Sequence, residues 1–145
     1  MKKLVLLLLM TVSCLTTTIM ADSRINLTPL PMQMNIVEGE LRLPESFTIS
    51  TGDLTAEEAD EATKFIELFT YVSGYSVSLT QSKEALIKMQ KYDGNVEIGN
   101  EGYTLDVTAD GIKIAANSAA GFFYAFQSIK KMLPACVMAN VKDEN

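Results

Sequence analysis

The segment from Thr55 to Gly74 constrains the fold more than any other part of the sequence, because both of its ends carry a helix signal. Thr55 is followed three residues later by Glu58, which is the spacing of a capping box at a helix start. Gly74 is the residue type most common just past a helix end. Between these ends, apolar residues recur every three or four positions, which predicts a helix over residues 55–73 with one buried face. The apolar positions are Ala59, Ala62, Phe65, Ile66, Phe69 and Val72.

A second helix is predicted over residues 119–133. Asn117 or Ser118 can cap its start, and Pro134 cannot continue it. Lys130 and Lys131 suit the negative end of the helix dipole. Its main apolar stripe consists of Phe122, Phe126, Ile129 and Leu133.

Strand signals occupy the rest of the chain. In residues 103–114, apolar and polar residues alternate on both sides of an Asp110-Gly111 turn, which predicts a β-hairpin. Weaker patterns predict a hairpin over 34–43, helical turns over 83–91, and strands over 47–50, 75–79 and 95–99. Together these elements predict an α+β fold: a mostly antiparallel sheet of about five to seven short strands with two main helices packed on one face.

The first 21 residues are typical of an export signal peptide. Lys2 and Lys3 precede an apolar run over residues 4–10, which is shorter than the roughly 20 apolar residues of a membrane-spanning helix. Cleavage after Ala21 suits ordinary signal peptidase, whereas residues 11–14 resemble a bacterial lipobox that ends at Cys14, and the sequence leaves both routes open. The expectation is an exported protein that is periplasmic, extracellular or lipid-anchored to a bacterial membrane.

Composition limits the chemistry that this chain can perform. Its 145 residues are enough for one domain, and they include no histidine and no tryptophan. Without histidine, Ser-His-Asp and Cys-His catalysis lack their base, and most transition-metal sites lose their usual ligand. Loss of Lys2 and Lys3 with the leader would move the net charge from −6 to −8, which disfavours nucleic acid as a partner. Cys136 would then be a lone thiol with no basic neighbour to activate it.

Two adjacent carboxylate pairs are the remaining candidates for catalysis, because glycosidases work with two carboxylates. Asp60 and Glu61 lie inside the first predicted helix, where neighbouring side chains point about 100° apart. Asp143 and Glu144 lie in the terminal tail, where nothing would fix their geometry. Both pairs are interpreted as solvated surface charge. The sequence therefore predicts no catalytic, cofactor-binding or metal-binding residue in this chain.

Residues 101–134 carry several short motifs in a fixed order. These are Glu101-Gly102-Tyr103, Asp110-Gly111, Gly121, Phe123-Tyr124, Gln127-Ser128 and Leu133-Pro134. In this order they closely resemble the end of the N-terminal, non-catalytic domain of bacterial β-N-acetylhexosaminidases of glycoside hydrolase family 20. The resemblance implies that residues 22–134 form that accessory domain and that 135–145 form a linker toward a catalytic (β/α)₈ barrel beyond Asn145.

The resemblance also implies a division of labour. In that family the barrel holds an Asp-Glu pair, and the acetamido oxygen of the substrate itself attacks, so a glycan substrate would be bound only through the barrel. This chain alone is then expected to be inactive, as an accessory part of a secreted enzyme that removes terminal N-acetylhexosamine from glycans. The alternative is a stand-alone secreted domain that binds a glycan or a protein. A reading frame that continues past Asn145 into a barrel would distinguish the first from the second.

The second predicted helix is apolar on more than one side. Phe123, Tyr124 and Met132 lie outside its main stripe, and only one side of a helix can face the sheet in a domain of this size. Some of these three residues are predicted to be exposed and to form an apolar patch with the tail around Val137 and Met138. The barrel is expected to dock there, and the domain without it is expected to self-associate.

Overall fold

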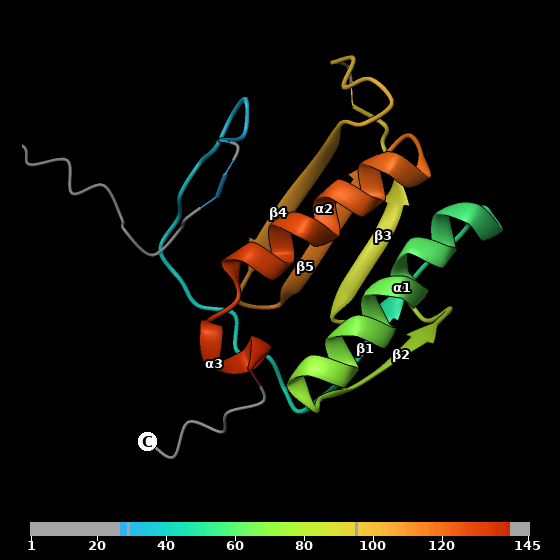
Figure 1. Ribbon diagram of the computed structural model, residues 1–145. Helices are drawn as coiled ribbons and strands as arrows, with labels where there is room; N and C mark the ends of the chain where they lie inside the picture. Colours follow the sequence, from blue (N-terminus) through green and yellow to red (C-terminus); the bar gives the residue numbers. More distant parts are fainter. Residues whose placement is uncertain (1–26, 29, 95, 140–145) are drawn as a thin grey trace, which may run out of the picture.

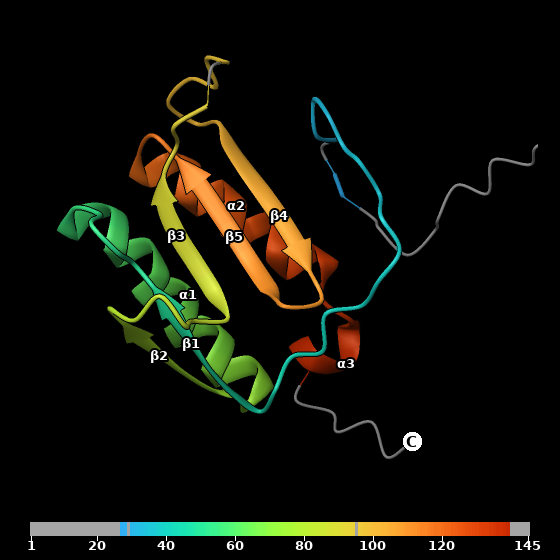
Figure 2. The same ribbon diagram turned by 180° about the vertical axis from the view of Figure 1, so that it is seen from behind.

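A computed structural model describes residues 27–28, 30–94 and 96–139 of the chain. One five-stranded sheet in the order β2-β1-β3-β5-β4 carries both long helices on the same face (Figure 1), and the opposite face is seen from behind in Figure 2. The strands are β1 Ser46–Ser50, β2 Ser76–Thr80, β3 Ile87–Lys91, β4 Tyr103–Thr108 and β5 Gly111–Ala116. The helices are α1 Ala56–Ser73, α2 Ala119–Met132 and the short α3 Ala135–Met138.

The α+β class and the placement of the two main helices are confirmed, but the expectation of a mostly antiparallel sheet is wrong. Three of the four strand pairings are parallel, and only β4 and β5 are antiparallel. Helix α1 returns the chain from the end of β1 to the start of β2, and a crossover of this kind places neighbouring strands in the same direction. Strands β3 and β5 continue that direction on the other side of β1.

Residues 83–91, expected as helical turns, contain strand β3 instead. Ile87 and Met89 are buried, whereas Lys88 between them is exposed. This alternation of period two is that of a strand with one face on the core. Parallel partners on both sides, β1 and β5, supply the backbone hydrogen bonds that stabilise the strand.

The expected hairpin over 34–43 is also wrong, since no residue of that segment is in a strand. Only Leu41 and Leu43 of the segment pack against the core. The remaining apolar side chains therefore have no buried surface on which a strand pattern could be stabilised. The expected strand over 95–99 is absent from 96–99, and residue 95 lies outside the described residues.

The core lies between the sheet and the two helices. Phe65 of α1 stacks on Phe126 of α2 with ring centroids 4.6 Å apart, and this contact joins the helices. Phe65 also stacks on Phe69, which meets Phe47 of β1 edge to face. The fully buried large side chains are Phe69, Phe122, Ile49, Ile87 and Ile114.

The last described residues extend this core. In the segment 135–145, which the sequence assigns to a linker, α3 packs Val137 and Met138 against the core from the end of the sheet. The predicted leader with Cys14, and the pair Asp143 and Glu144, lie outside the described residues.

Candidate functional site

The helical carboxylate pair is engaged with a neighbouring lysine. Asp60 and Glu61 lie 2.9 and 2.8 Å from the ammonium group of Lys64 on the surface of α1. The hydrogen bonds to Glu61 and to Asp60 raise the pKa of Lys64 above its ordinary value of 10.5. The structure thus places both carboxylates on the surface of α1, where they share one lysine.

The described residues include neither a cluster of metal ligands nor a helix suited to span a membrane. That part of the chain holds no group of three or more His, Cys, Asp or Glu side chains close enough to share a metal ion. Cys136 is half-buried in α3 as a free thiol. None of the helices within the described ranges combines the length and the apolar character that crossing a membrane requires.

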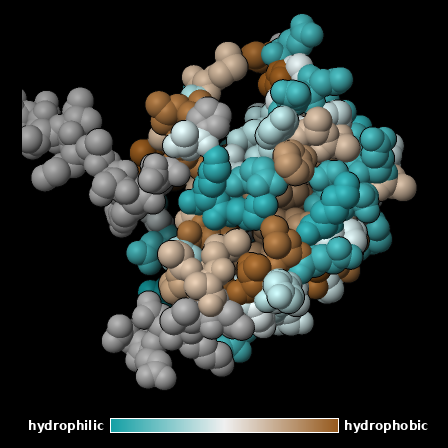
Figure 3. All heavy atoms as spheres, viewed as in Figure 1, coloured by the Kyte–Doolittle hydropathy of each residue, from teal (hydrophilic) through white to brown (hydrophobic). Residues whose placement is uncertain are grey.

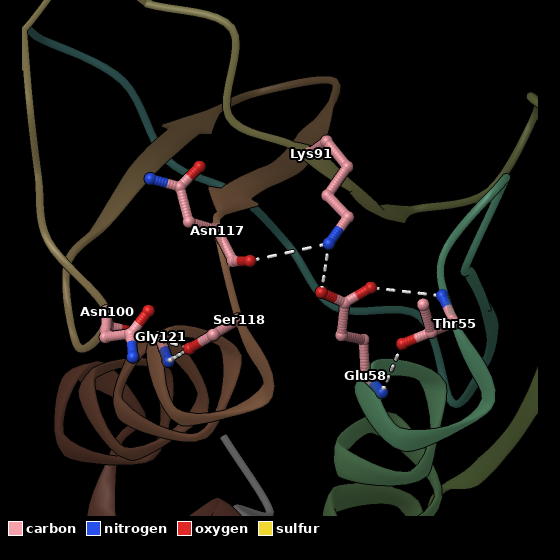
Figure 4. A network of polar contacts seen from close by, with 7 residues as sticks. All are labelled: Thr55, Glu58, Lys91, Asn100, Asn117, Ser118 and Gly121. Carbon is pink, nitrogen blue, oxygen red and sulfur yellow. Dashed lines mark hydrogen bonds and ion pairs between the residues drawn. The ribbon is translucent and has the colours of Figure 1, made fainter.

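The most elaborate polar site lies at the start of α1 (Figure 4). Glu58 closes the predicted capping box: its carboxylate accepts a hydrogen bond from the Thr55 amide at 3.0 Å, and its own amide donates to the Thr55 hydroxyl at 3.3 Å. The other oxygen of this buried carboxylate pairs with the ammonium group of Lys91, at the end of β3. Lys91 also donates to the Asn117 carbonyl at 3.4 Å, so one lysine links the start of α1 to the loop before α2.

The charge state of Glu58 is set by two opposing effects. Burial raises the pKa of this carboxyl group, but the hydrogen bonds from Lys91 and from Thr55 outweigh burial and hold the pKa below its ordinary value of 4.5. The sequence predicts Glu58 as part of the helix cap but carries no signal for its ion pair. Lys91 is 33 residues away, and only the pairing of β3 beside β1 brings the two together.

A second polar site lies at the start of α2 and includes glycines from the short motifs of residues 101–134. The Ser118 hydroxyl donates to the Asn100 carbonyl at 2.5 Å and accepts from the Gly121 amide at 3.4 Å (Figure 4). A Cβ atom on Gly121 would lie only 2.5 Å from the Gly102 carbonyl oxygen, so the helix approaches the chain before β4 as closely as glycine permits. These residues position α2 on the sheet.

A further motif contact lies farther along α2. The hydroxyl groups of Tyr103 and Ser128 are 2.5 Å apart and join β4 to the middle of α2. In the described structure, the motif residues Gly102, Tyr103, Gly121 and Ser128 thus act in packing and hydrogen bonding within the domain.

An apolar cavity lies at the end of the domain where α1, α2 and α3 meet the extended segment before β1. Its volume is about 270 Å³, and no carboxylate, lysine or arginine lines it. Its lining is mostly aliphatic and aromatic, so it is suited to apolar contact. A shallower hollow of about 450 Å³ on the opposite sheet face is lined by Lys88, Asp106, Asp110 and Lys113, among others.

The structure separates the residues of the predicted docking patch. Phe123 and Tyr124 are 43% and 41% exposed and meet edge to face with ring centroids 5.3 Å apart, near the start of α2. Met132 is half-buried at the other end of the helix, where it lines the apolar cavity together with Val137. Eight helical residues, or about 12 Å, separate Tyr124 from Met132. Two apolar surfaces, one at each end of α2, therefore replace the single predicted patch.

Known proteins with a related sequence cover most of the chain. Residues 24–143 match the sequence profile of a domain described as glycosyl hydrolase family 20, domain 2. A β-hexosaminidase from Vibrio vulnificus is 29% identical over 101 residues, which is 70% of this chain and 11% of that protein. The chain thus spans only a small part of the length of this relative.

Solved structures agree with the sequence match. The N-acetyl-β-hexosaminidase of Streptomyces plicatus superposes with a TM-score of 0.60 and 28% identity, over 67% of this chain and 19% of that one. The family 20 exo-β-N-acetylglucosaminidase of Vibrio harveyi shares the fold with a TM-score of 0.65 and 20% identity, over 77% of this chain and 16% of that one. This chain belongs to glycosyl hydrolase family 20, and it corresponds to the N-terminal, non-catalytic domain of that family.

Proposed function

We propose that this chain is the accessory N-terminal domain of an exported β-N-acetylhexosaminidase that removes terminal N-acetylhexosamine from glycans. The observation that carries the proposal is the family match over residues 24–143. Two of the matched relatives are named as hexosaminidases and one as an exo-β-N-acetylglucosaminidase, and each is several times longer than the matched region. The proposed chemistry therefore takes place on a catalytic barrel C-terminal to Asn145, and the glycan is bound there.

Export is part of the proposal and is supported by the leader. Lys2 and Lys3 followed by the apolar run over 4–10 are the features that support it. Cleavage after Ala21 would release the protein to the periplasm or the medium, whereas lipidation of Cys14 would anchor it to a bacterial membrane. Mass spectrometry of the protein recovered from its host would distinguish the two, because only the lipidated form starts at an acylated Cys14.

The proposed docking side of the domain is the one that carries the helices. Phe123 and Tyr124 offer an exposed aromatic pair there, and Figure 3 shows apolar residues interspersed among polar ones on that side. The opposite sheet face presents serine, threonine and lysine side chains from successive strands, such as Thr48, Ser78 and Lys113. Burial of apolar side chains away from water is favourable in free energy. The barrel is therefore proposed to cover Phe123 and Tyr124, with Met132 at the margin of the contact surface.

The proposal is tested by the gene and by activity. The reading frame should continue beyond Asn145 into a barrel with an Asp-Glu motif, and the longer protein should release nitrophenol from a nitrophenyl N-acetylglucosaminide. The present chain alone should release none. Turnover by the purified chain that disappears in Asp60→Asn or Glu61→Gln would contradict the proposal, and a true stop codon after Asn145 would favour a stand-alone binding domain.

Docking at the aromatic pair has its own test. Replacing Phe123 and Tyr124 together by serine should reduce self-association of the isolated chain, measured by light scattering across a concentration series. Tyr71→Ser is the matched control, since Tyr71 is an exposed aromatic residue on α1 rather than α2. Equal effects of the two changes would show that the aromatic pair has no special role.

A further inference from the structure

The extended segment that precedes the sheet exposes an unusual run of apolar side chains. Within residues 30–37, five such residues are exposed, although the chain there is in neither a helix nor a strand. They are Leu30, Met32, Met34, Ile36 and Val37, exposed by 79%, 108%, 44%, 50% and 73%. Contiguous exposed apolar residues are rare on monomeric proteins and mark a surface that is covered in some other state.

Both ends of this segment are held at the same end of the domain. On one side, the carbonyl of Thr28 accepts a hydrogen bond from Lys131, near the end of α2. On the other side, Leu41 and Leu43 pack on the core and share the apolar cavity with Val107, near the end of β4. Residues 30–40 lie on the β4 side of the sheet in both views (Figures 1 and 2).

Strand β4 has a free edge on that side. Within the described residues it pairs with β5 alone, since it is the last strand in the sheet order. Its apolar residues Tyr103, Leu105 and Val107 lie on the helix side: Tyr103 and Leu105 pack against the core, and Val107 lines the apolar cavity with Ile129 of α2. An edge strand with an open row of backbone N–H and C=O groups can pair with any passing strand, which natural proteins prevent by covering it.

We propose that residues 32–37 close as a sixth strand on the free edge of β4, parallel to it, since the segment and β4 run in the same direction (Figures 1 and 2). The segment has six residues, as does β4. Its side chains alternate in the required sense: Met32, Met34 and Ile36 would continue the apolar layer beside the helices, whereas Gln33 and Asn35 would face the polar side of the sheet. Pro31 has no N–H group to donate, which suits the first residue of an edge strand. Closure buries three of the exposed apolar residues, Met32, Met34 and Ile36, and caps the sheet edge in one step.

Hydrogen exchange of the purified full chain tests the closure. Peptides that contain residues 32–37 and 103–108 should both exchange about tenfold more slowly than an unstructured chain. Ile36→Asp places a charge on the side that would face the apolar layer, so the 32–37 peptide should lose its protection. The 103–108 peptide should lose only the protection that its pairing with β5 does not supply. Asn35→Asp is the matched control, because Asn35 would face the polar side of the sheet. Both peptides should keep their protection in this variant.

Internal controls make each outcome decisive. Ile36 is half-exposed in the open arrangement, so Ile36→Asp should leave the α2 peptide over 119–132 fully protected. Exchange of residues 32–37 at the unstructured rate in the unaltered chain overturns the proposal, as does an equal response to Ile36→Asp and Asn35→Asp. Protection that rises with protein concentration also overturns it, since the edge would then be covered by a second copy of the chain.

Discussion

The two long helices start at the same end of the sheet, where β1 and β5 end, yet different interactions hold their first turns. Helix α1 is attached by charge: the buried carboxylate of Glu58 pairs with Lys91 at the end of β3. Helix α2 is attached by close approach: Gly121 lies against the Gly102 carbonyl and against the Ala116 side chain. The first attachment should respond to pH and to loss of a charge, whereas the second should respond to added volume.

The largest expected effect is that of adding one methyl group to the start of α2. Gly121→Ala places Cβ 2.5 Å from a backbone oxygen and 2.8 Å from Cβ of Ala116, so the helix must move. Alanine favours a helix by about 1 kcal/mol over glycine, but overpacking costs about 1–3 kcal/mol, and here the clash is with backbone. We expect a net loss in the free energy of unfolding, measured by urea denaturation.

A neighbouring position provides the control. Ala120 is exposed in the same helical turn, and Ala120→Ser adds one atom that meets solvent. It should change stability by less than about 0.5 kcal/mol. If Gly121→Ala is as stable as the unaltered chain, α2 is not held by close approach, and the contrast between the helices fails.

The next effect should come from removing the charge that attaches α1. Glu58→Gln keeps an oxygen to accept from the Thr55 amide, as the capping box requires, but loses the ion pair with Lys91. A hydrogen bond to a charged group contributes about 1.5–3 kcal/mol, and Lys91 is half-exposed, so the lower end of that range is expected. Urea denaturation at neutral pH measures it. Glu57→Gln, at an exposed acid in the same first turn, should have little effect.

Acid should remove the same contribution without a mutation. Because the pKa of Glu58 is lower in the folded chain than in the unfolded one, its stabilisation is complete above about pH 4.5 and is lost as the pH falls through the folded pKa. The difference in stability between the unaltered chain and Glu58→Gln should therefore shrink below about pH 4.5. The contrast between Gly121→Ala and the unaltered chain should persist at low pH. If the difference in stability between the unaltered chain and Glu58→Gln stayed constant as the pH falls, the effect of Glu58 would not be electrostatic.

Local signals in the sequence predicted the elements that depend on neighbours in the chain. Three such signals depend only on contacts within a few residues: the capping box at Thr55, the turn at Asp110-Gly111 and the helix stop at Pro134. The structure confirms the helices and strands whose ends these signals mark. The parallel pairings were missed because they join segments far apart in the chain, as Ile49 and Ile87 show.

The local pattern of apolar residues predicted the wrong element where it fits both the helical period and the strand period. Leu86, Ile87 and Met89 fit a short helical stripe as well as a strand, and the presence of β1 and β5 on both sides decides in favour of the strand. The same limit applies to the sites. Glu58 was placed correctly at a helix start, but its partner Lys91 could not be identified before β3 was known to lie beside β1.

The smallest expected effect concerns the second contact of α2 with the sheet. Tyr103→Phe removes the hydroxyl group that lies 2.5 Å from that of Ser128 and leaves the ring in place. Both residues are half-buried, so water can replace the lost partner of Ser128, and the expected loss is about 0.5–1 kcal/mol. In the double variant Tyr103→Phe with Gly121→Ala, the loss of stability should differ from the sum of the losses in the two single variants. Both changes affect how the same helix packs on the sheet. Strict additivity would show that the start and the middle of α2 are held independently.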